Sequence, residues 1–361
     1  MTVSRPSIEA LLSQYRDRYI SEDMVAHGAV RACEVSGDRV ALTLQFGFPL
    51  AGYKAELEQK LKAHLAPVCP NLSLRIESAV APHAVKTGAK PIPGVKNILA
   101  VASGKGGVGK STTAVNLALA LAAEGARVGI LDADIYGPSQ PIMLGKAGQH
   151  PESTDQKSIE PIVSHGIQSM SIGYLVEPEQ AMVWRGPMVS SALQQLLNDT
   201  RWDNVDYLIV DLPPGTGDIQ LTLAQKVPVT AAIIVTTPQD IALADAIKGI
   251  AMFQKVNVPV LGIVENMAMH ICSNCGHKEH VFGAGGGEKL AAQYGVEMLG
   301  SLPLDIRIRE QTDGGKPSVA AEPNGEIAAM YRDIARRIGA KLSLEAKNYA
   351  VMAPVITISN T

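Results

Sequence analysis

A glycine-rich segment at residues 104–112 constrains the fold of this 361-residue chain more than any other feature. Its sequence, GKGGVGKST, fits the phosphate-loop pattern G-x-x-x-x-G-K-[ST]. A strand-like run at residues 98–102 precedes it, and apolar residues at helical spacing follow it. Glycines let backbone N–H groups point at phosphate oxygens, and the N-terminus of the following helix adds partial positive charge. We therefore expect Lys110 to reach terminal phosphates and the Ser111 hydroxyl to bind Mg²⁺. The residues expected to line this site are Gly104, Lys105, Gly106, Gly107, Val108, Gly109, Lys110, Ser111 and Thr112.

Short apolar runs alternate with helical stretches through the rest of the chain. The runs lie at residues 98–102, 128–132, 167–172, 207–211, 231–236, 260–264 and 298–302. Because only 4% of residues are aromatic and 46% are hydrophobic, the core must pack with Ala, Val, Leu and Ile, as buried parallel sheets do. The pattern predicts an α/β P-loop NTPase fold, a mostly parallel sheet covered by helices.

The first part of the chain has a different pattern. Residues 1–81 predict a small α+β domain with the order helix, strand, strand, helix, strand. Prolines and glycines mark residues 82–96 as a linker. Residues 97–345 then form the domain that contains the phosphate loop, and residues 346–361 form a C-terminal tail. The first domain contains no cluster of acids, bases or metal ligands, so its chemistry stays undetermined.

Three carboxylates follow predicted strands. Asp132 and Asp134 end the run at 128–132, and Asp211 ends the run at 207–211 before a loop rich in Gly and Pro. In an open α/β sheet, ligands bind where the carboxyl ends of the strands gather. A carboxylate there can hold hydrated Mg²⁺ or orient an attacking water, although a single one is often only a helix cap. Three beside a phosphate loop predict a nucleotide hydrolase.

The four cysteines divide into one pair and two single residues. Cys272 and Cys275 have the spacing at which two thiolates bind one zinc ion or iron–sulfur cluster. Two ligands are half of a four-ligand site, and His277 and His280 follow too closely for a zinc-finger pattern. A zinc site, a cluster bridged by two chains, and a redox or unliganded pair all remain open. The single residues, Cys33 and Cys69, are expected to pack as small apolar groups.

Lys105 separates this loop from an ordinary phosphate loop. The string KGGVGKST at residues 105–112 resembles the deviant loop of the nitrogenase iron protein, MinD and ParA class. The resemblance implies that Lys105 reaches across a nucleotide-sandwich dimer to the phosphates of the partner chain. A second ammonium there would offset charge that develops in phosphoryl transfer.

The same resemblance implies roles for residues outside the loop. Asp134 would position the attacking water, Asp132 and Asp211 would belong to the Mg²⁺ shell, and Asn266 would contact adenine. The sequence contains no Asn-Lys-x-Asp string, the guanine signature of many GTPases, so ATP is favoured over GTP. The catalytic residues implied are Lys105, Lys110 and Asp134.

Within this class, the chain resembles the Mrp/ApbC (Nbp-like) iron–sulfur carrier ATPases. The motifs are DADIYGPS at residues 132–139, WRGP at 184–187, DLPPGTGD at 211–218, ENM at 265–267 and CSNCGH at 272–277. The N-terminal unit resembles the small iron–sulfur-assembly domain of many members. The resemblance implies a homodimer in which Cys272 and Cys275 of each chain bridge a [4Fe–4S] cluster. It also implies ATP and Mg²⁺ as cofactors, slow hydrolysis coupled to transfer, and apo iron–sulfur proteins and cluster-assembly scaffolds as partners.

Two other functions remain open. One is a MinD- or ParA-like positioning protein, for which the basic residues of a C-terminal helix beside an apolar stripe give the best support. The other is a zinc-binding nucleotide switch. The net charge of -3 disfavours DNA, and no apolar run approaches the roughly 18 residues of a membrane span. Four cysteines are too few for a disulfide scaffold in a chain of this size, which indicates a reducing cytosol, and the N-terminus lacks the apolar core of a signal peptide. We therefore expect a cytoplasmic protein with neither a nucleic-acid nor a membrane partner.

Overall fold

The computed structural model describes residues 3–85, 88–153, 155, 157–176, 186–272 and 274–348. Residues 1–2 of the predicted N-terminal domain, residues 86–87 of the predicted linker and residues 349–361 of the expected tail lie outside these residues. So do Trp184 and Arg185 of the WRGP motif and Ser273 between the paired cysteines.

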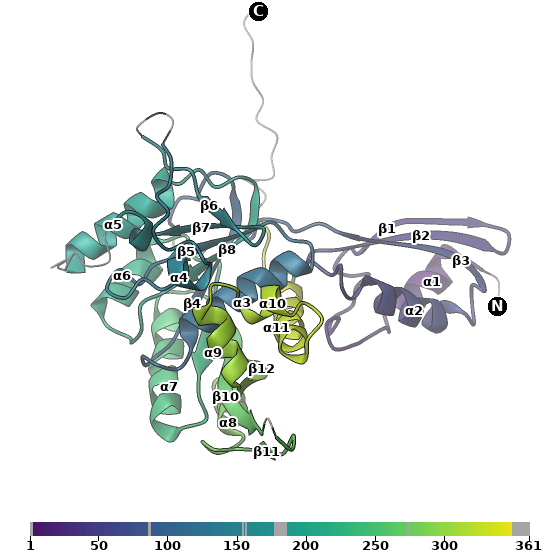
Figure 1. Ribbon diagram of the computed structural model, residues 1–361. Helices are drawn as coiled ribbons and strands as arrows, with labels where there is room; N and C mark the ends of the chain where they lie inside the picture. The colour runs from purple at the N-terminus through teal and green to yellow at the C-terminus, as the bar shows by residue number, and fades with distance from the viewer. Residues whose placement is uncertain are drawn as a thin grey trace, which may run out of the picture.

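The N-terminal domain is a three-stranded mixed sheet with two helices on one face (Figure 1). Its elements are α1 (Arg5–Leu12), β1 (Val30–Ser36), β2 (Arg39–Phe46), α2 (Lys54–Leu65) and β3 (Asn71–Ser78). β1 and β2 form an antiparallel hairpin, and β3 pairs parallel to β2. Alternate residues of β2, from Val40 to Phe46, are buried in one core with both helices. The predicted element order is confirmed.

The larger domain is built on a sheet that has nine strands in the described part of the chain. Its spatial order is β11-β10-β9-β4-β8-β5-β7-β6, with β12 paired to β10. The strands are β4 (Val95–Ala102), β5 (Val128–Asp132), β6 (Ile162–Ser164), β7 (Ile167–Ser171), β8 (Val205–Asp211), β9 (Ala231–Thr236), β10 (Val260–Ile271), β11 (Lys278–Glu279) and β12 (Glu297–Leu304). All pairs are parallel except β6 with β7 and β10 with β11.

The predicted mostly parallel sheet is therefore confirmed, with two differences in detail. The short strands β6 and β11 were not expected, because two or three residues carry no periodic signal. β10 continues to Ile271 rather than ending at residue 264, and it leads the chain directly to Cys272.

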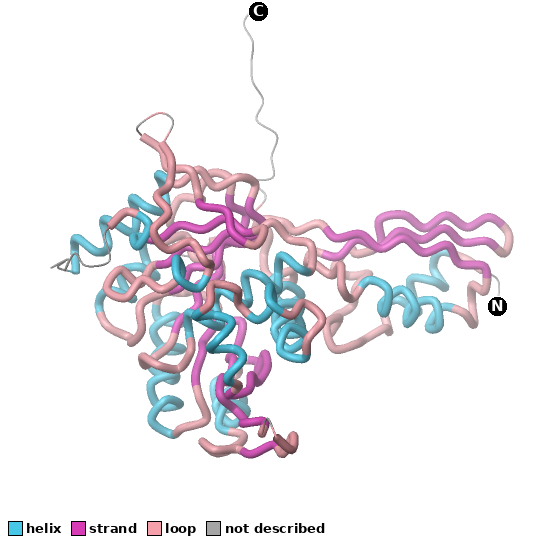
Figure 2. Tube along the Cα trace, in the orientation of Figure 1, coloured by secondary structure: helices cyan, strands magenta, loops and turns pink. Residues whose placement is uncertain are grey.

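Helices cover both faces of this sheet (Figures 1 and 2). One face is covered by α5 (Gly186–Asp199), α6 (Asp218–Lys226), α7 (Asp240–Lys255) and α8 (Gly286–Tyr294). The other is covered by α3 (Lys110–Ala123), α9 (Ile306–Asp313), α10 (Ser318–Ala321) and α11 (Glu326–Leu342). β4 serves both cores, because Ile98 and Ala100 join the first and Leu99 and Val101 the second.

The described helices include none that is both long and apolar enough to cross a bilayer.

Candidate functional site

The glycine-rich loop connects β4 to α3, at the edge where the parallel strands end. Gly107 and Gly109 adopt φ of +81° and +80°, in the left-handed region that favours glycine. A Cβ on Gly109 would lie 2.2 Å from Nδ2 of Asn266, so the close approach also requires glycine. Nδ2 of Asn266 donates to the carbonyl of Val108 at 2.9 Å. Asn266 thus supports the loop from a strand that is distant in sequence.

Lys110 begins α3 and is buried with its charge balanced. Its ammonium forms an ion pair with Asp211 and donates to Oγ of Ser111 at 3.1 Å. Asp211 ends β8, is fully buried, and also accepts from Nε2 of Gln140 at 2.9 Å. The lysine and the carboxylate that the sequence analysis placed at one edge therefore meet directly.

Asp132, at the end of β5, is fully buried and surrounded by donors. One of its oxygens accepts from the backbone N–H groups of Ser139 at 2.9 Å and Gln140 at 3.0 Å. Burial, and next the Asp211 carboxylate, raise the pKa of Asp132 well above its ordinary value, although these donors act in the opposite direction. Burial also raises the pKa of Asp134, which lies nearer the surface. Both carboxyls therefore have an environment in which added positive charge is favourable.

Gln140, in the short helix α4 (Gln140–Met143), is the site residue that sequence reasoning missed. It connects three parts of the site, because Nε2 contacts both Asp211 and the carbonyl of Ser111, and its backbone N–H contacts Asp132. Its Oε1 is buried and has no hydrogen-bond partner among the described residues. The only available signal was its position directly after the 132–139 motif.

The donor set fits a hard cation and a polyphosphate. Carboxylate, amide and hydroxyl oxygens from Asp132, Asp211, Gln140 and Ser111 are the ligand types that Mg²⁺ prefers. The N-terminus of α3, with Lys110 as its first residue, supplies the positive end that phosphates require. Lys105 is exposed at the surface of the loop, in contrast to buried Lys110.

The cysteine pair lies in the turn between β10 and β11. Cys272 is half-buried and Cys275 is exposed. The turn is closed by two hydrogen bonds of 2.9 Å, from the N–H of Cys272 to the carbonyl of His277 and from the N–H of Gly276 to the carbonyl of Cys272. Backbone N–H groups of Cys275 and Asn274 lower the pKa of the Cys272 thiol, which favours the thiolate that binds metals.

Neither nearby histidine completes a metal site. Nδ1 of His280 contacts the carbonyl of Ala268 at 2.7 Å, and His277 is exposed. Among the described residues, no three His, Cys, Asp or Glu side chains gather where they could hold one ion. A single chain therefore offers the pair of thiols without further ligands in its described part.

The single cysteines lie in the N-terminal domain. Cys69 is buried, and its Sγ contacts the carbonyl of Leu65 at 3.4 Å. Cys33, on β1, is half-buried and packs against the core of that domain.

Two family matches divide the chain where the fold divides it. Residues 94–339 match the NUBPL iron-transfer P-loop NTPase family, and residues 5–72 match a family described as iron-sulfur cluster assembly protein. The first match covers more than half of the chain. The chain belongs to the NUBPL iron-transfer P-loop NTPase family. The resemblance expected from the sequence motifs is thus confirmed.

Relatives of this NUBPL-family NTPase match most of its length. It is 64% identical over 263 residues to the iron-sulfur cluster carrier protein of Pseudomonas fragi, covering 73% of this chain and 92% of that protein. It is 51% identical over 337 residues to the iron-sulfur cluster carrier protein of Haemophilus influenzae, covering 93% and 91%.

A solved structure supports the fold of the larger domain. A nucleotide-binding protein from Archaeoglobus fulgidus, in complex with ADP, is 36% identical and has a TM-score of 0.58. The match covers 66% of this chain and 93% of that one.

Proposed function

We propose that this protein is an ATP-dependent carrier of iron–sulfur clusters. It binds and hydrolyses ATP with Mg²⁺, and two copies hold a [4Fe–4S] cluster that they transfer to apo-proteins. The observation that carries the proposal is the turn of Cys272 and Cys275. It offers two accessible thiols, and no third metal ligand lies beside them among the described residues. The relatives named as iron-sulfur cluster carrier proteins support the identity of the cargo.

The number of ligands supports a dimer. A cubane cluster takes four thiolates, and one chain supplies two from this turn. A two-fold axis that passes through the cluster brings the same turn from a second copy, because a symmetric interface uses the same surface on both subunits. A cluster held at such an axis is exposed and bound by few contacts per chain, which suits a cargo that must leave.

The phosphate loop supplies the nucleotide half of the proposal. Lys110 and the N-terminus of α3 bind the phosphates, and Ser111 with Asp132 and Asp211 belongs to the Mg²⁺ shell. In the proposed dimer, exposed Lys105 reaches the partner's phosphates.

Two further roles complete this proposed site. Asp134 orients the attacking water, and Asn266, which already contacts the loop, lies beside adenine. Nucleotide binding then changes how the two subunits meet, and with it how tightly the cluster is held.

The structure of α11 argues against the alternative of a MinD- or ParA-like positioning protein, which was based on this helix. The apolar stripe of that helix, including Ile327, Tyr331 and Ile334, is buried against the sheet and α3. Its basic residues are paired: Arg332 and Arg336 contact Glu124, Arg337 contacts Asp333, and Lys341 contacts Glu297. The helix does not present a free amphipathic face to a membrane or to DNA.

Anaerobic reconstitution with iron and sulfide tests the proposal. The wild-type protein is expected to gain the broad visible absorbance of a cluster and to transfer that cluster to the apo form of a [4Fe–4S] enzyme. Cys272→Ala and Cys275→Ala are expected to lose both properties. Cys33→Ala is the matched control, because it removes a half-buried thiol from the N-terminal domain and should leave loading unchanged.

Three outcomes would contradict the proposal. One is roughly one zinc per chain and no iron in protein purified without oxygen, which would indicate a zinc switch. Another is equal loading of the Cys33→Ala and Cys275→Ala variants. The third is ATP-dependent sedimentation with liposomes in place of cluster transfer, which would indicate a positioning protein.

A further inference from the structure

The far end of α3 is fixed to the N-terminal domain through one buried carboxylate. Glu124 is the residue that caps the C-terminus of α3, and its side chain is fully buried. It accepts from Arg332 Nε and Arg336 of α11, both at 2.7 Å. Glu124 also accepts two hydrogen bonds from the N-terminal domain. The N–H of Gly52 donates to its carboxylate at 2.9 Å, and the N–H of Ala51 donates to its backbone carbonyl at 3.0 Å.

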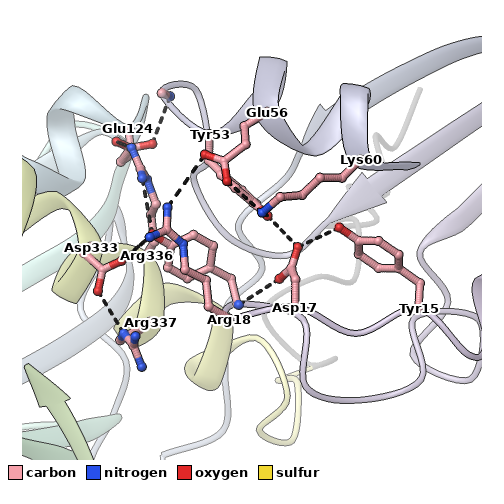
Figure 3. A network of polar contacts seen from close by, with 12 residues as sticks. Tyr15, Asp17, Arg18, Tyr53, Glu56, Lys60, Glu124, Asp333, Arg336 and Arg337 are labelled. Carbon is pink, nitrogen blue, oxygen red and sulfur yellow. Dashed lines mark hydrogen bonds and ion pairs between the residues drawn. The ribbon is translucent and has the colours of Figure 1, made fainter. Parts of the chain in front are cut away.

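A second set of contacts joins the N-terminal domain to α11 (Figure 3). The hydroxyl of Tyr19 donates to Asp333 at 2.5 Å and accepts from Arg336 at 3.3 Å. The guanidinium of Arg336 lies over the rings of Tyr19 and Tyr53, 5.7 and 5.8 Å from their centres. Arg336 therefore bonds the cap of α3 and the N-terminal domain at the same time.

Apolar packing between the domains is incomplete beside these polar contacts. Ala340 of α11 joins the core of the N-terminal domain, but a cavity of about 360 Å³ lies next to it. Phe46, Phe48 and Leu344 are among the residues that line the cavity. The polar contacts of Glu124 and Arg336 therefore lie beside a gap in the apolar packing between the domains.

α3 links this contact to the phosphate site. The helix has 14 residues, so it is about 20 Å long, with Lys110 as its first residue and Glu124 directly after its last. Its inner face is buried, including Ala114, Leu117 and Leu121, and close packing there resists bending of the helix. A displacement of its N-terminus at the loop would therefore be transmitted to Glu124 at the other end.

We propose that the N-terminal domain controls ATP affinity through α3, with Glu124 as the positioning residue that couples the two. The proposal rests on the proposed nucleotide site. The docked N-terminal domain holds α3 where the loop binds phosphates, so undocking weakens ATP binding. Linkage is reciprocal, and ATP binding must therefore strengthen docking by the same factor.

Two matched variants test the coupling in the full chain. Tyr19→Phe removes the hydroxyl that contacts Asp333 and Arg336 across the interface. Tyr15→Phe removes a hydroxyl that contacts Asp17 inside the N-terminal domain. We expect Tyr19→Phe to weaken binding of a fluorescent ATP analogue about fivefold and to raise the KM for ATP without changing turnover at saturation. Tyr15→Phe should match the wild type.

Hydrogen exchange of the wild-type protein gives a second readout that needs no variant. Saturating Mg·ATP should slow exchange in peptides covering residues 47–53, where the N–H groups of Ala51 and Gly52 bond Glu124. Unchanged exchange with ATP bound would overturn the coupling and leave the proposed nucleotide site intact, as would equal effects of the two tyrosine variants. A wild-type protein that binds no ATP would overturn both proposals.

Discussion

Glu124 is a buried carboxylate whose contribution to folding stability depends on its charge, and therefore on pH. Burial by itself would raise its pKa, but hydrogen bonds from Arg336 and Arg332 outweigh burial, and the pKa lies below the ordinary value of 4.5. A carboxyl whose pKa is lowered by folding contributes its full stabilisation of the fold at pH values above its unfolded-state pKa. That stabilisation is lost as the pH falls through the folded-state pKa.

The pH dependence of this carboxylate is directly measurable. Glu124→Gln should lower the midpoint of urea unfolding at pH 7, since hydrogen bonds to a charged group contribute about 1.5 to 3 kcal/mol. The difference between wild type and variant should shrink as the pH falls below 4.5, because the wild type then loses the same charge. A difference that is constant from neutral to acid pH would contradict the assigned role of the charge.

At the scale of the element, the loop between β4 and α3 depends on a contact that is remote in sequence. Gly109 combines a left-handed backbone with the close approach of Asn266 from β10. Two separate effects, backbone strain and collision, would therefore follow from a side chain at this position.

A pair of glycine variants separates these effects. Gly109→Ala should weaken ATP binding, because the new Cβ would lie 2.2 Å from Nδ2 of Asn266 and break the hydrogen bond by which Asn266 supports the loop. Gly148→Ala is the control: Gly148 has a similar φ of +75°, is exposed, and has nothing within 4 Å of the added Cβ. Both variants carry backbone strain of about 1 to 2 kcal/mol. Thermal melting should show the backbone strain in both variants and a further loss of stability from the collision in Gly109→Ala. Nucleotide titration should show weaker ATP binding in Gly109→Ala alone, and unchanged binding there would refute the contact.

Strands and loops could be predicted from the sequence where a local pattern of residues defines them. The buried parallel strands read as continuous apolar runs, and the phosphate loop has a fixed spacing, so both were found from the sequence. The extension of β10 was missed because polar Glu265 and Asn266 interrupt its apolar run. Its pairing with β12 shifts register at that point, a feature that only the folded sheet defines.

Long-range polar contacts could not be predicted in the same way. Gln140 and Glu124 act through partners far along the chain, at Asp211 and Arg336. Neither residue stands in a periodic pattern or at motif spacing that would mark it. Sequence reasoning thus named the groups that we propose contact a ligand, and the structure added residues that hold those groups in place.

At the scale of the whole molecule, the two domains and the cysteine turn occupy separate regions. Figure 1 shows the N-terminal domain beside α11, and β11 with the cysteine turn at another side of the larger domain. Docking of the N-terminal domain therefore leaves the turn available to a second copy. The proposed carrier joins two such chains at the turn and binds one nucleotide in each.

Native mass spectrometry of the anaerobically reconstituted protein tests this arrangement most directly. The account predicts a species of two chains with one [4Fe–4S] cluster, about two irons per chain, that is absent from Cys272→Ala. A single chain that carries a complete cluster, or a single chain with one zinc ion, would contradict it.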